Sequence, residues 1–440
     1  MFTVARKSKF ILTICFTLGF LFLSVTGCSV ISQIESGLRA PIPSETPTPT
    51  SETPLPIAQG TTQTLEPAKT IILWVPPQFS PSEENPAGTL LEDRLRGFET
   101  LHPGLTVELR IKALSGESSL LNSLSVTAAA APEALPGLIL LSRSDMEIAA
   151  LKSLIFPIPS RAAEYNTPDW FPFTLDMASA QGVQYGLPLF IDPFVLAYNK
   201  KEIAFPPTTW QELVAQHSAV AINLEDPHAL FPLSIYSSYG GVLADENGKP
   251  ILGADPLTRT YQLIFAGAES NAFPAWLVNL HSTNDSLNAL EQGQSSYALV
   301  WASQVLRSAD EDISLAPLPG NSTDLAGFAD GWMLCITNPN AELSSMDILL
   351  ADYLLQPEFL AGWSEAAGYL PAQKSVLQNW QNQTNIGFLE MAAVESQVIP
   401  GINIQQATTE ILNQYTASLI RRQTSPMQAV LDTLSTLEVK

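Results

Sequence analysis

Eight tryptophans are the residues of this sequence whose neighbours most suggest a chemical role. Trp74 lies at the end of the strand-like run "TIILWV", one residue before its last, Trp301 follows "YALV", and Trp332 follows the bend-like "GFADG". An indole face attracts the C–H-rich face of a sugar, or a cation, while nearby carboxylates and amides bind hydroxyl groups. We expect Trp332 to contact a ligand, and Trp74 and Trp301 either to do so or to pack in the core. Three others are read as structural: Trp170, Trp210 and Trp380.

No pattern for covalent or metal chemistry accompanies these rings. The sequence contains no G-x-S-x-G, H-E-x-x-H or C-x-x-C. The segment "GVLADENGKP" departs from a phosphate loop at Pro250, and Pro256 stands where a calcium loop needs a glutamate. Asp310 and Asp312 lie in the charged run "ADED", which is more typical of a solvated loop than of a catalytic pair. The four histidines are not paired at metal-ligand spacing. We therefore expect a protein that is not an enzyme, with no metal and no cofactor.

Alternating strand and helix signals must position these side chains. Residues 70–75, 105–111 and 134–142 are short apolar or alternating runs typical of strands. The stretches between them, "LLEDRLRGFETLHPG" and "SSLLNSLSVTAAAA", have a helical pattern. This β-α-β-α-β series predicts a mostly parallel sheet covered by helices.

Three local signals lie further along the chain. Asn247-Gly248 between two strand-like pieces predicts a hairpin. Cys335, within the apolar run "WMLCIT", is expected to be a small core residue. Ser425 and Pro426 are expected to begin the last helix as its N-cap and first residue.

The N-terminus has the pattern of an exported lipoprotein. Basic residues precede the apolar residues 10–25, a run shorter than the roughly 20 residues that span a bilayer. This predicts a signal peptide over residues 1–27. The ending "VTGC" resembles the bacterial lipobox, which implies that Cys28 is lipidated. The alternatives are a plain secreted protein or an uncleaved anchor, with Cys28 incidental. Residues 28–65 are rich in Pro, Ser and Thr and predict an extended linker.

The composition limits the partners. The formal net charge of −22 would repel phosphate backbones, so we expect no nucleic acid partner. Once the signal peptide is removed and Cys28 acylated, Cys335 is the one free cysteine left, so no disulfide forms within the mature chain. We expect a monomer.

Several stretches, taken in order, resemble the extracellular solute-binding proteins of family 1, the maltose-binding-protein-like class that serves ABC importers. The longest is "YGLPLFIDPFVLAYNKKEIAFPPTTWQELVA". Others are "RLRGFETLHPGLTVELRI", "LNALEQGQSSYALVWAS", "GFADGWMLCITNPN", "WSEAAGYLPAQKSV" and "RRQTSPMQAVLDTL". At the Pro-rich "WVPPQFSPSEENPAG" the sequence lacks the polar tip usual in this family.

The resemblance implies an α/β protein with the two-lobed, type II periplasmic-binding-protein fold. Each lobe would hold a mixed, mostly parallel sheet flanked by helices, with hinge strands between the lobes. Expected boundaries are residues 66–192 for the first part of lobe 1, 193–328 for lobe 2 and 329–372 for the return to lobe 1. Residues 373–440 would form C-terminal helices that pack mainly on lobe 2.

The resemblance also implies where a ligand would bind. Asp192 would lie between the lobes, where its carboxylate accepts a sugar hydroxyl, pairs with a cationic ligand, or merely caps a strand end. The expected ligand-binding residues are Trp74, Asp192, Tyr239, Trp301, Asp330, Trp332 and Tyr369.

The implied function is that of a substrate-binding lipoprotein, which captures a mono- or oligosaccharide by hinge closure and delivers it to a membrane permease. Two alternatives remain. One is the same fold binding a cationic solute such as a polyamine, favoured by the acidic surplus and Asp192. The other is a surface-tethered glycoside hydrolase, which needs an acid/base pair that the sequence does not reveal. The expected location is outside the cytoplasm, on a lipid anchor.

Overall fold

A computed structural model describes residues 69–158, 167–321 and 327–439. The predicted signal peptide, Cys28 and the linker lie outside the described residues. Within the described ranges, every helix is too short or too polar to cross a bilayer.

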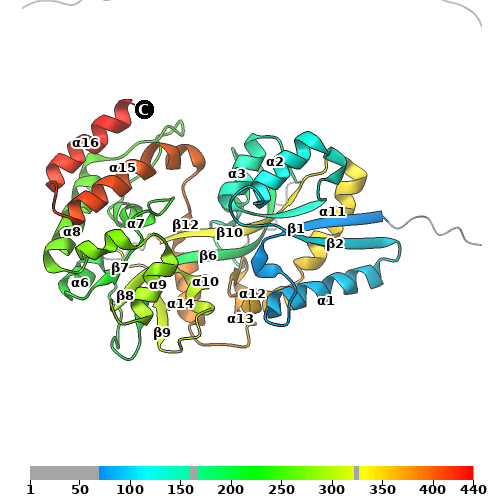
Figure 1. Cartoon of the computed structure of the whole chain (residues 1–440), viewed down its shortest axis with the longest axis horizontal. Coiled ribbons are helices and arrows are strands. Elements are labelled where there is room, and N and C mark those ends of the chain that lie inside the picture. The colour runs from blue at the N-terminus through cyan, green and yellow to red at the C-terminus, as the bar shows by residue number, and fades with distance from the viewer. Residues whose placement is uncertain (1–68, 159–166, 322–326, 440) are drawn as a thin grey trace, which may run out of the picture. The chain divides into compact units, whose positions relative to one another are not determined.

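Lobe 1 forms around three parallel strands, with β1 between β2 and β3 (Figure 1). The predicted β-α-β-α-β series is confirmed, since helices connect these strands in the expected order. The strands are β1 (Lys69–Val75), β2 (Leu105–Ile111) and β3 (Leu138–Ser142), and a small hairpin follows of β4 (Ser179–Ala180) and β5 (Val183–Gln184). The helices are η1 (Pro77–Phe79), α1 (Pro86–Leu101), α2 (Leu120–Ala130), η2 (Pro132–Ala134), α3 (Arg143–Leu151), α5 (Thr174–Met177), α11 (Ala341–Leu354), α12 (Pro357–Ala367) and α13 (Lys374–Gln378).

Lobe 2 forms around β8, which pairs in parallel with β7 (Figure 1). A second hydrophobic core lies here, beneath helices α6, α7, α8, α15 and α16. The strands are β7 (Val220–Ala221), β8 (Tyr297–Trp301) and β9 (Ile313–Ala316). The helices are α6 (Trp210–Ala215), α7 (Leu230–Ser238), α8 (Ala254–Ser270), η3 (Ala275–Asn279), α9 (Thr283–Glu291), α10 (Ala302–Leu306), α14 (Ile386–Val394), α15 (Ile402–Ile420) and α16 (Pro426–Val439).

Two long antiparallel strands, β6 (Gly186–Asn199) and β10 (Gly327–Ile336), run between the lobes (Figure 1). The first half of β6 pairs with β10, and its second half pairs with β8 and β9 of lobe 2. In turn, β10 pairs with β3 of lobe 1. Two short strands pair with the crossing strands: β11 (Leu370–Pro371) pairs with β6, and β12 (Ser396–Val398) pairs with β10. The two lobes thus share one hydrogen-bonded sheet, and the predicted two-lobed fold is confirmed.

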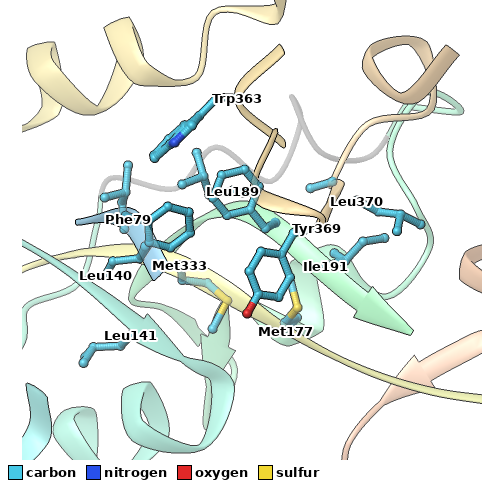
Figure 2. Packing of buried hydrophobic residues seen from close by; sticks show 14 of the residues in the cluster. Phe79, Leu140, Leu141, Met177, Leu189, Ile191, Met333, Trp363, Tyr369 and Leu370 are labelled. Atoms are coloured by element: carbon cyan, nitrogen blue, oxygen red, sulfur yellow. The ribbon is translucent and has the colours of Figure 1, made fainter. Parts of the chain in front are cut away.

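The crossing strands are held on the lobe 1 side by packed aromatic rings (Figure 2). The ring of Phe190, on β6, lies 5.4 Å from that of Phe79 and 4.9 Å from that of Trp363. Figure 2 shows Tyr369 beside this group, close to Met177. Each such aromatic pair stabilises the folded protein by about 0.5–1.5 kcal/mol, in addition to the effect of burying its surface. The rings therefore fix β6 and Tyr369 in place.

Other local predictions have mixed outcomes. Trp210, Trp380 and Cys335 are buried, as predicted. Ser425 caps α16, because its Oγ accepts the N–H of Gln428 at 3.3 Å. The predicted hairpin is wrong in part: the Asn247-Gly248 turn forms, but its flanks make a single bridge in place of paired strands. Pro250, in the second flank, has no N–H to donate to a ladder, which limits the pairing.

The expected bend before Trp332 is also wrong. Residues 327–336 form a continuous strand, with a register shift between Trp332 and Met333 where β6 carries the extra residue Leu189. Pro188, beside Leu189, has no N–H to give to the ladder, which favours a bulge here. A bulge turns nearby side chains, and Trp332 lies directly at it.

Gly331 lies where the crossing strands pack closely together. A Cβ at this position would overlap the carbonyl oxygen of Phe190 and the sulfur of Met177. We expect Gly331→Ala to lower the free energy of unfolding by about 1–3 kcal/mol, measured by urea denaturation. Gly362→Ala is the control: the residue is exposed within α12 and a Cβ there meets nothing, so this change should stabilise by about 0.5–1 kcal/mol. Equal effects from both substitutions would contradict the close approach.

Candidate functional site

A cavity of about 470 Å³ opens where the crossing strands meet lobe 2. Its volume lies within the roughly 300–1,000 Å³ typical of small-molecule sites. Most of its wall comes from lobe 2, and the crossing strands form its floor. The lining residues are Asp192, Asn223, Glu225, Asp226, Pro227, His228, His281, Ser282, Thr283, Asn284, Trp301, Ser303, Gln304, Arg307, Asp330, Gly331, Trp332 and Tyr369.

Two aspartates face each other on the floor of the cavity. Asp192 of β6 lies directly opposite Asp330 of β10 in the antiparallel register, so both side chains project from the same face. Asp192 is the one charged residue of a strand in which all but the last residue are buried. Its carboxylate accepts the N–H of Ser303 at 2.9 Å and the hydroxyl of Ser303 at 2.6 Å. Asp330 accepts the N–H of Arg143 at 3.2 Å. Each carboxylate is thus bonded to a different lobe.

Burial makes both carboxyl groups hard to ionise. Removal from water raises the pKa of Asp192 to about 7, and the hydrogen bonds from Ser303 and the charge of Arg307 offset this only in part. Burial likewise raises the pKa of Asp330, although His228, Arg143 and the N–H of Gly331 favour its charged form. Both groups therefore respond to any charge that enters the cavity.

Flat aromatic faces border these carboxyl groups. Trp332 follows Asp330 by two residues on β10 and is half-buried. Its ring meets that of Tyr369 edge-on, with centroids 6.4 Å apart. Trp301 ends β8 and packs edge-on against Phe194 at 5.4 Å. Tyr369 is mostly buried, so it supports the Trp332 ring more than it presents its own face.

One wall of the cavity is a loop, residues 223–228, that was not predicted from the sequence. Asp226 accepts the N–H of His228 at 3.2 Å and that of Leu230 at 2.7 Å, which holds the loop at the start of α7. Nδ1 of His228 is buried and has no hydrogen-bond partner. The signal that could have revealed this loop is "NLEDPHAL", in which Asn and Asp precede a proline and then a helix.

Arg307 is the one Lys or Arg side chain that lines the cavity among the described residues. Its guanidinium lies 4.9 Å from the centroid of the Tyr369 ring and donates to the carbonyl of Ala367 at 3.3 Å. It also donates to the hydroxyl of Ser303 at 3.2 Å. Arg307 therefore ties lobe 2 to the segment around Tyr369.

Five of the seven expected ligand-binding residues come together at this cavity, and two lie elsewhere. The five are Asp192, Trp301, Asp330, Trp332 and Tyr369. The indole of Trp74 is 1% exposed, because neighbours on both sides of β1 enclose it, and the Lys112 ammonium lies 4.3 Å from its ring. Tyr239 ends α7 outside the cavity, with the guanidinium of Arg259 4.1 Å from its ring.

The described ranges contain no group of three or more His, Cys, Asp or Glu side chains placed to hold a metal ion. The cavity instead offers hydrogen-bond acceptors, amide groups and indole faces. These groups can bind and orient a polar molecule.

Comparison with known proteins places the chain among binding proteins. A family model described as bacterial extracellular solute-binding protein matches residues 81–358. Among similar solved structures is the sugar-binding protein MalE of Xanthomonas citri, with a TM-score of 0.68 and 18% identity over 84% of this chain and 96% of that one.

Two further structures were determined with a sugar bound. Maltose-bound MalE3 of T. maritima has a TM-score of 0.64 and 18% identity, over 84% of this chain and all of that one. A solute-binding protein of Thermotoga lettingae with α-D-tagatose has a TM-score of 0.62 and 18% identity, over the same shares. At such identities these likenesses show the fold.

Asp192 yields a prediction about pH. Because its carboxyl pKa is about 7 in the folded protein and lower in the unfolded chain, the folded state binds more protons between about pH 4 and pH 7. The free energy of unfolding should therefore fall as the pH rises through this window. Asp192→Asn removes this titration and keeps an oxygen for the N–H of Ser303. We expect it to reduce the fall by up to about 4 kcal/mol, measured by denaturation at each pH.

The exposed Asp93, which pairs with Arg96 at 2.8 Å, supplies the control. In Asp93→Asn, the free energy of unfolding should fall with pH as steeply as in the unmodified protein. A D192N curve parallel to that of the unmodified protein would show that Asp192 does not titrate in this range.

Proposed function

The chain belongs to the bacterial extracellular solute-binding proteins, and from that premise we propose that it captures a carbohydrate between its two lobes for an ABC importer. The observation that carries this proposal is the half-buried indole of Trp332 beside the carboxyl groups of the buried Asp192 and the half-buried Asp330 at the crossing strands. A sugar needs both features, since its C–H face stacks on a ring while its hydroxyls seek acceptors. Similar proteins that hold maltose and α-D-tagatose support a saccharide ligand.

The proposed mechanism follows from the position of the cavity. Most lining residues belong to lobe 2 or to the crossing strands, so a sugar first binds there. Lobe 1 then rotates about β6 and β10 and covers the sugar. The closed form is favoured only by the contacts that it adds, so affinity reports that difference. The sugar leaves unchanged, which agrees with the lack of a recognisable catalytic motif in the sequence.

A cationic solute is a second candidate, favoured by the four acidic side chains in the cavity wall. Salt separates the two candidates. Attraction between a polyamine and carboxylates weakens as ionic strength rises, whereas stacking of a neutral sugar on indole is little screened.

The carbohydrate proposal predicts that tryptophan fluorescence or calorimetry detects binding of at least one of glucose, maltose, maltotetraose and D-tagatose. Trp332→Leu should weaken that binding at least about tenfold, because the flat face is lost. Trp276→Leu is the matched control, as Trp276 is also half-buried but lies outside the cavity. Absence of binding by the whole panel, or unchanged affinity in W332L, counts against the proposal.

We also propose that Cys28 carries the lipid that holds the protein at the outer face of the membrane. Buried acyl chains contribute about 0.8 kcal/mol per methylene, so two or more chains anchor firmly. The protein expressed in a bacterium should enter the detergent phase on partitioning, and Cys28→Ser should leave it in the aqueous phase. Cys335→Ala, which removes a buried core thiol, should not change the partitioning. Aqueous partitioning of the unmodified protein would exclude the anchor.

A further inference from the structure

The charges in the cavity wall are unbalanced. Four carboxyl groups line it, from Asp192, Glu225, Asp226 and Asp330, against the single guanidinium of Arg307 among the described lining residues. Glu225 is exposed and bonds to Nδ1 of His281 at 2.9 Å, so it contributes at the rim. Asp192 and Asp226 are buried, and Asp330 is half-buried.

The carboxyl groups of Asp192, Asp226 and Asp330 receive hydrogen bonds from uncharged donors. Asp192 bonds to the N–H and hydroxyl of Ser303. Asp226 bonds to two backbone N–H groups of its own loop. Asp330 bonds to the backbone N–H groups of Arg143 and Gly331. Within the described residues, none of the three bonds to a Lys or Arg side chain, and a buried carboxylate without a cation is costly.

The nearby arginines are directed elsewhere. Arg143 turns its guanidinium to Glu147 at 3.2 Å, and Arg307 donates to Ser303 and Ala367. A further carboxyl group, Asp145, interacts electrostatically with Asp330 from helix α3. A ligand that carries a carboxylate or phosphate would therefore meet several carboxyl groups and, among the described lining residues, only one Lys or Arg side chain, that of Arg307.

His228 lies in the cavity wall beside two of these carboxyl groups. Its Nδ1 atom is buried at the cavity wall without a partner, and its ring interacts electrostatically with both Asp226 and Asp330. In the tautomer with the proton on Nε2, Nδ1 is an acceptor. If the ring turns toward the cavity when a ligand binds, this atom can accept an N–H group of the ligand.

We propose that the cavity selects a saccharide that carries a protonated amine over the neutral sugar of the same shape. This inference rests on the proposed carbohydrate function. The indole of Trp332 binds the ring of the sugar, while the ammonium group lies among Asp226, Asp330 and His228 and supplies the missing positive charge. Because burial raises the pKa of Asp192 and Asp330, binding of the cation also drives protons off these groups into the solvent.

The test compares glucose, glucosamine and N-acetylglucosamine by calorimetry at about pH 6, where the amine is protonated. We expect glucosamine to bind at least about tenfold more tightly than glucose, and N-acetylglucosamine, which has no charge, to bind no more tightly than glucose. Titration in two buffers of different ionisation enthalpy should detect protons released by glucosamine and not by glucose. The binding of maltose and of spermidine is measured in the same way.

Each outcome bears on one proposal. If glucose or maltose binds and glucosamine binds no more tightly than glucose, the amine preference is wrong and the carbohydrate function stands. If no saccharide binds, the carbohydrate function itself fails. If spermidine binds more tightly than glucosamine, the sugar ring contributes nothing and the amine-sugar inference fails.

A substitution separates a charge effect from damage to the fold. Asp330→Asn should reduce the ratio of glucosamine to glucose affinity at least about fivefold, and Asp226→Asn should act in the same direction if D330N does not fold. Asp93→Asn, at an exposed position outside the cavity, should leave the ratio within about twofold. A merely structural role would weaken both sugars equally, so an unchanged ratio in D330N and D226N overturns the proposal.

Discussion

The structure depends on the antiparallel pairing of β6 with β10. This pairing places two carboxyl groups side by side between the lobes. Asp192 and Asp330 lie opposite each other, yet one bonds to lobe 2 through Ser303 and the other to lobe 1 through Arg143. A buried polar group that is not bonded costs free energy, so each bond fixes its lobe relative to the strands. The cavity opens beside these carboxyl groups and Trp332, and lobe 2 supplies most of its wall.

This arrangement connects binding with motion in the account that we propose. Aromatic rings pack on Phe190 and hold the crossing strands rigid at that point. Within the sheet, β6 and β10 connect the strands of lobe 1 with those of lobe 2. A sugar on the lobe 2 wall would add contacts only when lobe 1 approaches, which is the condition for closure. Because the carboxyl groups lie on the strands about which we propose that the lobes rotate, their protonation and the ligand would influence each other.

Sequence patterns predicted much of the fold, because periodicity and turn residues are local properties. The strands near residues 70–75 and 105–111 and the cap at Ser425 follow from such signals. Placement of the site was harder. Trp74 ends an apolar run just as Trp301 does, and only the tertiary neighbours decide that one is enclosed while the other lines a cavity. Asp226 and His228 were missed because their role comes from a loop that folds against a strand distant in the sequence.

The most direct measurement is a crystal structure of the full-length protein saturated with the sugar that binds most tightly among those tested. The account predicts that the sugar ring lies on the indole of Trp332, that its polar groups contact Asp192, Asp226 or Asp330, and that lobe 1 has moved toward lobe 2 about β6 and β10. A sugar found outside this cavity, or bound within it while the lobes keep their present separation, would contradict the account.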